Sequence, residues 1–182
     1  ICHCAAQNGK MILVDAEESW IQKPVDEVTD KMMAKYNREK VVVFNTFQLY
    51  RYDRLEFLKQ SAALAAQKSY LLGAKLVRGA YMEKERKRAE EMNYPSPIQP
   101  DKESCDRDYN EAVRFCIDHL QYIALFVGTH NEYSSMLTTE LMQQKGIDAH
   151  HPHVYFSQLF GMSDNISFNL AAAGFRVSKY LP

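Results

Sequence analysis

Residues 74–89 read AKLVRGAYMEKERKRA, and within this stretch a short apolar run gives way to a densely charged one. The apolar part, 74–77, is typical of a buried strand, and the charged part has the composition of a solvated helix. Arg78, Gly79 and Tyr81 lie at the change between them. A strand that delivers a cation, a glycine and an aromatic ring to the start of a helix is typical of the rim of a binding site.

Short apolar runs of the same kind recur along the whole chain. They are rich in Val, Ile, Leu and Phe, are too short for helices and are bounded by polar residues, which is typical of buried parallel strands. We therefore predict six strands, at 11–14, 41–44, 74–77, 124–127, 153–156 and 175–177.

The segments between these runs have apolar residues at helical spacing. Gly73, Gly146 and Gly174 are predicted to end three of the helices. The proline-rich stretch 93–101 predicts a loop, which either covers a ligand or is a plain surface insertion. We expect helices at 19–37, 54–72, 82–92, 106–122, 133–145 and 164–173.

Strand and helix alternate six times, which predicts an α/β protein with a parallel sheet and right-handed crossovers. In an open sheet functional residues gather at one switch point, whereas every strand of a barrel contributes from its carboxyl end. Polar side chains follow each predicted strand here. We therefore expect a distorted (β/α)8 TIM-like barrel, with residues 1–182 forming part of one barrel domain, truncated at both ends and holding about six β/α units.

Composition excludes several classes of protein. The chain of 182 residues has a net charge of -1, which argues against a nucleic-acid surface. No apolar stretch approaches the ~20 residues of a transmembrane helix, and peripheral contact with a membrane stays open. The four cysteines are predicted to be reduced thiols. Cys2 and Cys4 lack two further metal ligands at matching spacing, and the histidines of 150–153 are better explained by a polar loop that leads into a strand.

The polar groups that follow the strands predict a cofactor enzyme. Their carboxylates and histidines do not cluster as metal ligands do, and neither a G-x-S-x-G elbow nor a G-x-G-x-x-G fingerprint is present. Amides, cations and small residues together suit a large polar cofactor held without a Rossmann fold. The groups are Asp15, Asn45, Lys75, Arg78, Tyr81, His130, Asn131, Gln158, Lys179 and Tyr180.

Three of these side chains have a purely structural alternative. His130 would then be a core histidine, Asp15 a helix N-cap or a structural ion pair, and Tyr81 a packing residue.

Six motifs, spread over nearly the whole chain, resemble the proline dehydrogenase family, the flavoenzymes that begin proline catabolism. One such motif is weak support, whereas all six in the family's order make chance agreement improbable. The motifs are VDAEES at 14–19, FNTFQLY at 44–50, KLVRGAYMEKER at 75–86, GTHNE at 128–132, VYFSQLFGMSD at 154–164 and KYLP at 179–182.

The resemblance implies that FAD is the cofactor and that L-proline is oxidised to Δ1-pyrroline-5-carboxylate. A hydride would pass from the ring carbon next to nitrogen to flavin N5, and electrons would then pass to a quinone in a membrane. The implied location is the cytoplasmic face of a bacterial inner membrane or the mitochondrial inner membrane and matrix. The implied partners are L-proline, the quinone and a peripheral membrane contact, with no metal and no nucleic acid.

By motif position, the resemblance assigns catalytic roles to five residues. Asp15 would pair with an active-site lysine on a strand outside the chain and so organise the substrate pocket. Lys75 would be the cation near flavin N5, where it would favour the reduced, anionic ring. Tyr81, Leu159 and Tyr180 would line the proline pocket.

The resemblance also implies the cofactor contacts. Asn45 stands where many members have a glutamine near the pyrimidine edge of the flavin, and Cys105 stands where some have a threonine. Met82 replaces an aromatic ring that some members stack on adenine. The implied FAD contacts are Asn45, Lys75, Val77, Arg78, Gly79, Ala80, Cys105, Gly128, Thr129, His130, Asn131, Ser157 and Gln158.

Two alternatives stay open beside this reading. Hydroxyproline dehydrogenases share the fold, but a smaller residue at the position of Tyr180 leaves room there for the hydroxyl group, so tyrosine favours proline. The second alternative is a non-catalytic barrel relative or fragment, which would lack the flavin. The family's paired arginines and nearby glutamate, which bind the substrate carboxylate, are expected beyond KYLP.

Overall fold

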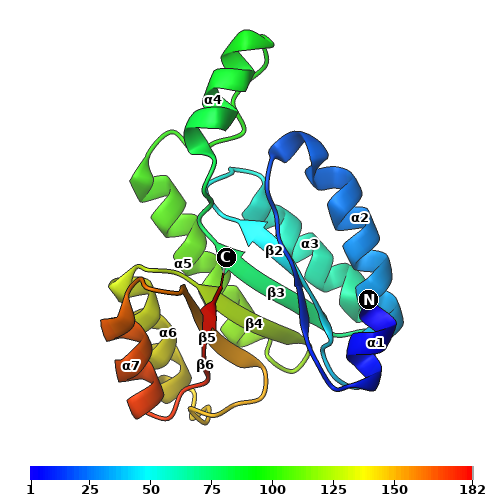
Figure 1. The fold of residues 1–182 in the computed structure, drawn as a ribbon, viewed down its shortest axis with the longest axis vertical. Coiled ribbons are helices and arrows are strands. Elements are labelled where there is room, and N and C mark those ends of the chain that lie inside the picture. Colours follow the sequence, from blue (N-terminus) through cyan, green and yellow to red (C-terminus); the bar gives the residue numbers. More distant parts are fainter. Residues whose placement is uncertain (182) are drawn as a thin grey trace.

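A computed structural model of the chain describes residues 1–181 and contains one parallel sheet that curls into half a barrel (Figure 1). The strands follow one another across the sheet in chain order, and every neighbouring pair is parallel. This confirms the predicted α/β fold with six parallel strands. They are β1 (Ile12–Val14), β2 (Val43–Gln48), β3 (Leu72–Val77), β4 (Ile123–Gly128), β5 (Val154–Leu159) and β6 (Val177–Tyr180).

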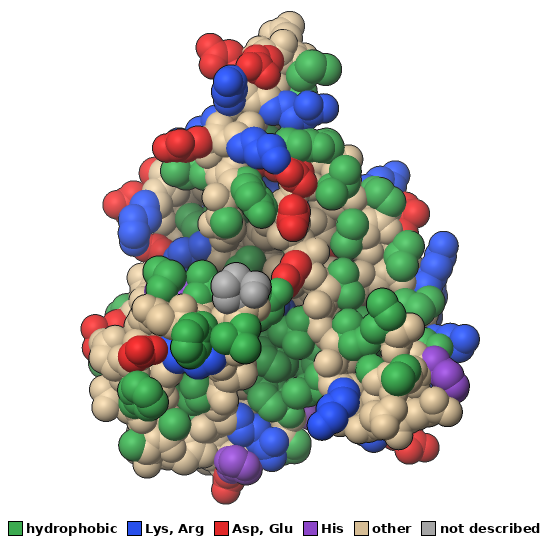
Figure 2. All heavy atoms as spheres, in the orientation of Figure 1, with side chains coloured by type: hydrophobic (Ala, Val, Ile, Leu, Met, Phe, Trp, Pro, Cys, Tyr) green, Lys and Arg blue, Asp and Glu red, His purple; other side chains and the backbone are tan. Residues whose placement is uncertain are grey.

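At least one helix follows each strand from β1 to β5, α1 precedes β1, and the helices pack mainly on the outer face of the curled sheet (Figure 1). The exception is α4, which projects from the body of the molecule and carries charged side chains of both signs (Figures 1 and 2). The helices are α1 (Cys2–Gln7), α2 (Ser19–Tyr36), α3 (Arg54–Gln67), α4 (Met82–Glu91), α5 (Lys102–Asp118), α6 (Glu132–Gln144) and α7 (Asp164–Ala172). None of the helices within residues 1–181 is both long and apolar enough to cross a membrane.

The alternation of side chains along the strands divides the apolar residues into two layers. The larger layer lies between the sheet and the helices and includes Val43, Phe47 and Leu76. The smaller layer lies on the concave, inner face of the sheet. There the ring of Phe126 meets Phe44 edge-on, with centroids 5.0 Å apart, and stacks on Tyr155 at 4.6 Å. Inner-face residues further along the same strands therefore point toward the open end of the half-barrel.

The predicted strands are mostly too short at their carboxyl ends. Strand β2 runs to Gln48 instead of ending at 44, and β5 runs to Leu159. Polar residues are tolerated inside these strands because they hydrogen-bond to neighbouring segments, as when the Thr46 hydroxyl donates to the Val14 carbonyl at 2.7 Å.

The prediction that Gly73 ends a helix is wrong. Helix α3 ends at Gln67, and Ser69, at φ 54°, makes the left-handed turn after it. Gly73 lies within β3, where a Cβ would approach the Val43 carbonyl oxygen to 2.3 Å. Its lack of a side chain thus permits close approach of β2, whereas Gly146 and Gly174 do follow helix ends as predicted, both at positive φ.

Candidate active site

The carboxyl ends of all the strands meet around one cavity of about 530 Å³. Figure 2 shows a hollow in the middle of this face of the molecule. The cavity gathers every residue predicted to be catalytic or to contact the cofactor except Asn45 and Cys105. Its predicted lining residues are Asp15, Lys75, Val77, Arg78, Gly79, Ala80, Tyr81, Gly128, Thr129, His130, Asn131, Ser157, Gln158, Leu159 and Tyr180. Lys179, which was also expected at a strand end, instead forms an ion pair with Asp164 on α7 at 2.6 Å.

Asp15 directly follows β1, at one edge of the sheet, and its carboxylate is bonded to side chains of β3 and of β6, the strand at the opposite edge. Its carboxylate accepts a hydrogen bond from Lys75 Nζ at 2.6 Å and another from the Tyr180 hydroxyl. Lys75 Nζ also lies 4.5 Å from the centre of the Tyr180 ring. The bond to Asp15, together with burial, raises the pKa of Tyr180 to about 12, so this hydroxyl is a proton donor at neutral pH.

Within residues 1–181, the lysine that pairs with Asp15 is Lys75, on β3. The expected pairing with a lysine outside the chain stays a prediction. The alternative that Asp15 caps a helix is wrong, because Glu18 is the N-cap residue of α2. The alternative of an ion pair agrees with the geometry. Because Lys75 lies on β3 and is largely buried, with a side chain only 11% exposed, it brings a cation deep into the cavity.

Asn45 does not face the cavity. It is fully buried on the helix side of β2, where its Nδ2 donates to Asp26 Oδ1 at 2.8 Å. Arg54 donates to both oxygens of the same carboxylate, at 3.1 and 3.0 Å. The expectation that Asn45 contacts a flavin on the inner face is therefore contradicted by its orientation.

Two inner-face residues of β2, Thr46 and Gln48, line the cavity instead. Gln48 Nε2 donates to the carbonyl oxygens of Ala16 and Glu17, at 3.1 and 3.0 Å, and thereby fixes the loop that carries Asp15. Thr46 lies two residues and Gln48 four residues after Phe44, so an unbroken strand alternation through FNTFQ places both on the inner face with Phe44. The predicted strand end at 44 led us to overlook Thr46, whereas Gln48 had been expected, with Asn45, among the polar residues that follow this strand.

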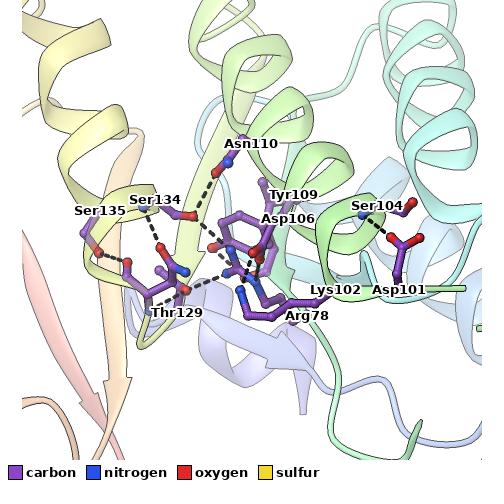
Figure 3. Close-up of polar contacts among 12 residues, drawn as sticks. Arg78, Asp101, Lys102, Ser104, Asp106, Tyr109, Asn110, Thr129, Ser134 and Ser135 are labelled. Atoms are coloured by element: carbon purple, nitrogen blue, oxygen red, sulfur yellow. Dashed lines mark hydrogen bonds and ion pairs between the residues drawn. The ribbon is translucent and has the colours of Figure 1, made fainter. Parts of the chain in front are cut away.

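Arg78 follows β3 and is bonded from three directions (Figure 3). Its Nε donates to Asp106 at 2.7 Å, one terminal nitrogen donates to the Thr129 hydroxyl at 2.8 Å, and the other to Ser134 at 3.0 Å. The guanidinium also lies 4.3 Å from the ring centre of Tyr109, which is fully buried. The position of this cation is thus set by α5 and α6 as well as by β3.

The turn after β4 links the cavity to α6. Thr129 accepts from Arg78 and from the Asn131 backbone N–H, and Asn131 caps α6 by accepting from Ser134 N at 3.0 Å. His130 is exposed and its Nδ1 lies 2.9 Å from Ser163 Oγ, so the core-histidine alternative is wrong. Burial and the nearby Lys179 lower the pKa of His130, which makes its neutral form dominant at pH 7.

Gln158 is fully engaged by protein groups. Its Nε2 donates to the Thr129 carbonyl at 3.2 Å, and its Oε1 accepts from the Ser167 hydroxyl at 2.8 Å. The side chain is buried against α7, so only part of it reaches the cavity.

A second cavity, of about 770 Å³, shares the segment 78–81 with the first and is also lined by Cys105. Arg78 and Lys102 line both cavities. Gly79, at φ +130°, lies against Tyr50, and a Cβ there would come within 2.5 Å of its ring. Only glycine therefore allows the backbone to run between the two cavities along this path.

The donors around both cavities fit an anionic, polar cofactor. Cations, hydroxyls and amides dominate the polar lining, and the volumes are those of sites for large ligands, which span ~300–1,000 Å³. Within residues 1–181, no group of three or more His, Cys, Asp or Glu is arranged to hold a metal ion.

Comparison with known proteins gives one consistent family. A sequence model of the family described as proline dehydrogenase matches residues 1–182. The chain is 38% identical to "Proline dehydrogenase 1, mitochondrial" of Dictyostelium discoideum over 188 residues, covering all of this chain and 32% of the relative. It is 37% identical to the human protein of the same name, covering 98% of this chain and 30% of the relative.

A hydroxyproline dehydrogenase of Xenopus laevis is also 37% identical, over 98% of this chain and 39% of the relative. Among solved structures, proline utilization A of Bdellovibrio bacteriovorus, inactivated by N-propargylglycine, matches with a TM-score of 0.91 and 21% identity. That match covers 99% of this chain and 19% of the other, and it supports the barrel-type fold. The chain spans about a third of the length of the first two curated relatives.

Proposed function

The chain belongs to the proline dehydrogenase family, and from that premise we propose that the full-length protein oxidises L-proline to Δ1-pyrroline-5-carboxylate. FAD, when bound, supplies the hydride acceptor, and a membrane quinone takes the electrons onward. The observation that carries the proposal is the cluster of Asp15, Lys75 and Tyr180 inside a cavity rich in polar donors.

In this proposal Lys75, Val77, Gly79 and Ala80 hold the flavin ring. Lys75 is largely buried and faces the inner side of the sheet, so its charge favours negative charge that develops nearby during the reaction. Thr46 and Gln48 take the place first expected for Asn45, because they line the cavity.

The adenine end of the cofactor would extend into the second cavity. Support comes from the shared lining of the two cavities at 78–81 and from Cys105, which lies in the second one. Thr129, Asn131 and Ser157 would contact the part of the cofactor between its two ends.

Tyr180, Tyr81 and Leu159 would enclose the proline ring. All three line the first cavity, and Leu159 and Tyr180 are direct neighbours across β5 and β6. Asp15 accepts a hydrogen bond from the Tyr180 hydroxyl, which in this proposal would hold the tyrosine ring over the substrate. We further propose that the six strands are part of one eight-stranded barrel domain, which closes around the same cavity.

The proposed location is a membrane surface of a mitochondrion or a bacterium, where the quinone is found. The Dictyostelium and human relatives are named mitochondrial, which supports the first of these.

Hydroxyproline dehydrogenase activity is the main competing function. Comparing kcat/KM of the full-length protein for L-proline and for trans-4-hydroxy-L-proline distinguishes them. We expect L-proline to be preferred, because Tyr180 fills the space that a ring hydroxyl needs. A preference for the hydroxylated substrate would contradict the proposal, and a protein that turns over neither substrate would favour a non-catalytic relative.

A further inference from the structure

Two cations lie where the two cavities meet, and one carboxylate binds both. Arg78 and Lys102 each line both cavities. Asp106, on α5, accepts from Arg78 Nε through Oδ1 at 2.7 Å and from Lys102 Nζ through Oδ2 (Figure 3). Each carboxylate oxygen thus holds one cation.

The two cations differ in how firmly they are held. The Arg78 side chain is 23% exposed and has further contacts with Thr129, Ser134 and Tyr109. The Lys102 side chain is 74% exposed, and Asp106 is the partner that the structure gives it within residues 1–181. A partly buried, multiply bonded cation is more strongly fixed than an exposed one. Asp106 therefore adds one more contact to an already well-positioned Arg78, and it holds the otherwise exposed Lys102 side chain next to Arg78.

The charge of Asp106 is retained at neutral pH. Burial works to raise its pKa, but the hydrogen bonds from Lys102 and Arg78 outweigh burial and hold the pKa below its usual value. Two cations and one carboxylate leave a surplus of positive charge at the junction. Arg78 uses its Nε–H on Asp106 and keeps free N–H groups for a ligand.

We propose that Asp106 is a positioning residue, which holds Arg78 and Lys102 so that they bind the diphosphate of the cofactor at the junction of the two cavities. This inference rests on the proposed function, because it takes FAD as the ligand. Asp106 itself does not touch the diphosphate, since both of its oxygens are occupied by the cations.

The test is the dissociation constant of FAD, measured by flavin fluorescence as apoprotein of the full-length enzyme is titrated. Asp106→Asn should weaken FAD binding about tenfold, or about 1.4 kcal/mol. Asp106→Glu should restore most of the affinity, because it returns a charged acceptor for both cations. Ser134→Ala, a smaller change at another partner of Arg78, should weaken binding about threefold, or about 0.7 kcal/mol.

The matched control is Glu103→Gln, which removes an exposed charge from the first turn of the same helix. It should leave the FAD affinity unchanged. Equal or tighter FAD binding by Asp106→Asn would overturn the inference, because Asp106 would then merely neutralise the cations. A loss of affinity in Glu103→Gln as large as in Asp106→Asn would also overturn it. Failure of the wild-type protein to bind FAD at all would instead contradict the proposed function.

Discussion

At the scale of single residues, Asp15 is the group on which the proposed chemistry depends most. It is the acceptor shared by Lys75 and Tyr180, which come from strands far apart in the sheet. Asp15→Ala removes both contacts without changing the remaining lining of the cavity. We expect proline turnover to fall at least ~tenfold, about 1.4 kcal/mol of barrier, while the flavin is retained.

The measurement is kcat/KM for L-proline, with the flavin content of each preparation determined from its absorption. Unchanged kinetics in a flavin-loaded Asp15→Ala protein would mean that the ion pair with Lys75 is only structural.

Asn45 and Gln48 provide a matched pair on the two faces of β2. Asn45→Ala breaks a buried network with Asp26 and should lower stability by about 1–3 kcal/mol while FAD affinity stays the same. Gln48→Ala removes a lining side chain that also fixes Ala16 and Glu17, and it should weaken FAD binding ~tenfold. Thermal unfolding and flavin titration of both variants check this, and the reverse pattern would mean that the two faces are assigned wrongly.

At the scale of elements, α4 is attached to α2 by one buried carboxylate. Glu85 is fully buried and accepts from the backbone N–H and the hydroxyl of Ser19, each at 2.6 Å. The contact satisfies a free N–H group at the start of α2. Because the loop before α2 carries Asp15, α4 helps to set the position of that loop.

Glu85→Ala should therefore lower the free energy of unfolding by about 1–3 kcal/mol, since it leaves the polar groups of Ser19 without their partner. Glu90→Ala, at an exposed position of the same helix, is the control and should have little effect. Comparable thermal midpoints for the two variants would show that the contact contributes nothing to stability.

Asp30, on α2, makes stability depend on pH. Burial and the neighbouring charge of Asp26 raise its pKa from 3.8 to about 6. A raised carboxyl pKa stabilises the fold below about pH 4, and this contribution is lost as the pH rises through about 6. Asp30→Asn should therefore stabilise the protein by about 1 kcal/mol at pH 7, discounted for partial exposure, and by little at pH 4.

Thermal midpoints across this pH range, with exposed Glu27→Gln on the same helix as control, check the prediction. A gain that is as large at pH 4 as at pH 7 would rule out the charge of Asp30 as its cause.

The sequence predicted the strands and their order well, because alternating apolar runs and helical segments reflect burial directly. It predicted the ends of strands poorly. In β2 the apolar run stops at Phe44, but the strand continues through polar residues whose partners, such as Asp26 for Asn45, come from distant segments. Contacts between distant segments cannot be recognised from the neighbouring sequence. The placement of Asn45 beside the flavin therefore came from the family motif, and the orientation of Asn45 contradicts it.

The cavity residues were easier to predict than their contacts. Parallel strands bring their carboxyl ends to one edge, so polar residues after each run are expected to meet. The pairing of Asp15 with Lys75 could not be predicted in this way, because Lys75 lies within β3, two residues before its end. Its side chain faces the cavity because side chains alternate between the two faces of a strand.

In the molecule as a whole, the two faces of the curled sheet have different roles: the outer face packs against the helices, and the inner face lines the cavity. The helix side carries the larger apolar layer and buried networks such as that of Asp26 and Arg54. The inner side carries a small aromatic layer and, beyond it, the cavity with Lys75 and Asp15. Substitutions on the helix side of a strand are therefore expected to lower stability, and substitutions on the inner side of the same strand are expected to change cofactor binding or turnover.

In the proposed function, this cavity is the active site of a flavin enzyme that oxidises proline. The most direct test is the visible spectrum of the purified full-length protein, before and after L-proline is added without oxygen. We expect a flavin band at about 450 nm that bleaches on addition of L-proline, because the substrate reduces the cofactor. A colourless protein, or a flavin band that L-proline leaves unchanged, would contradict it.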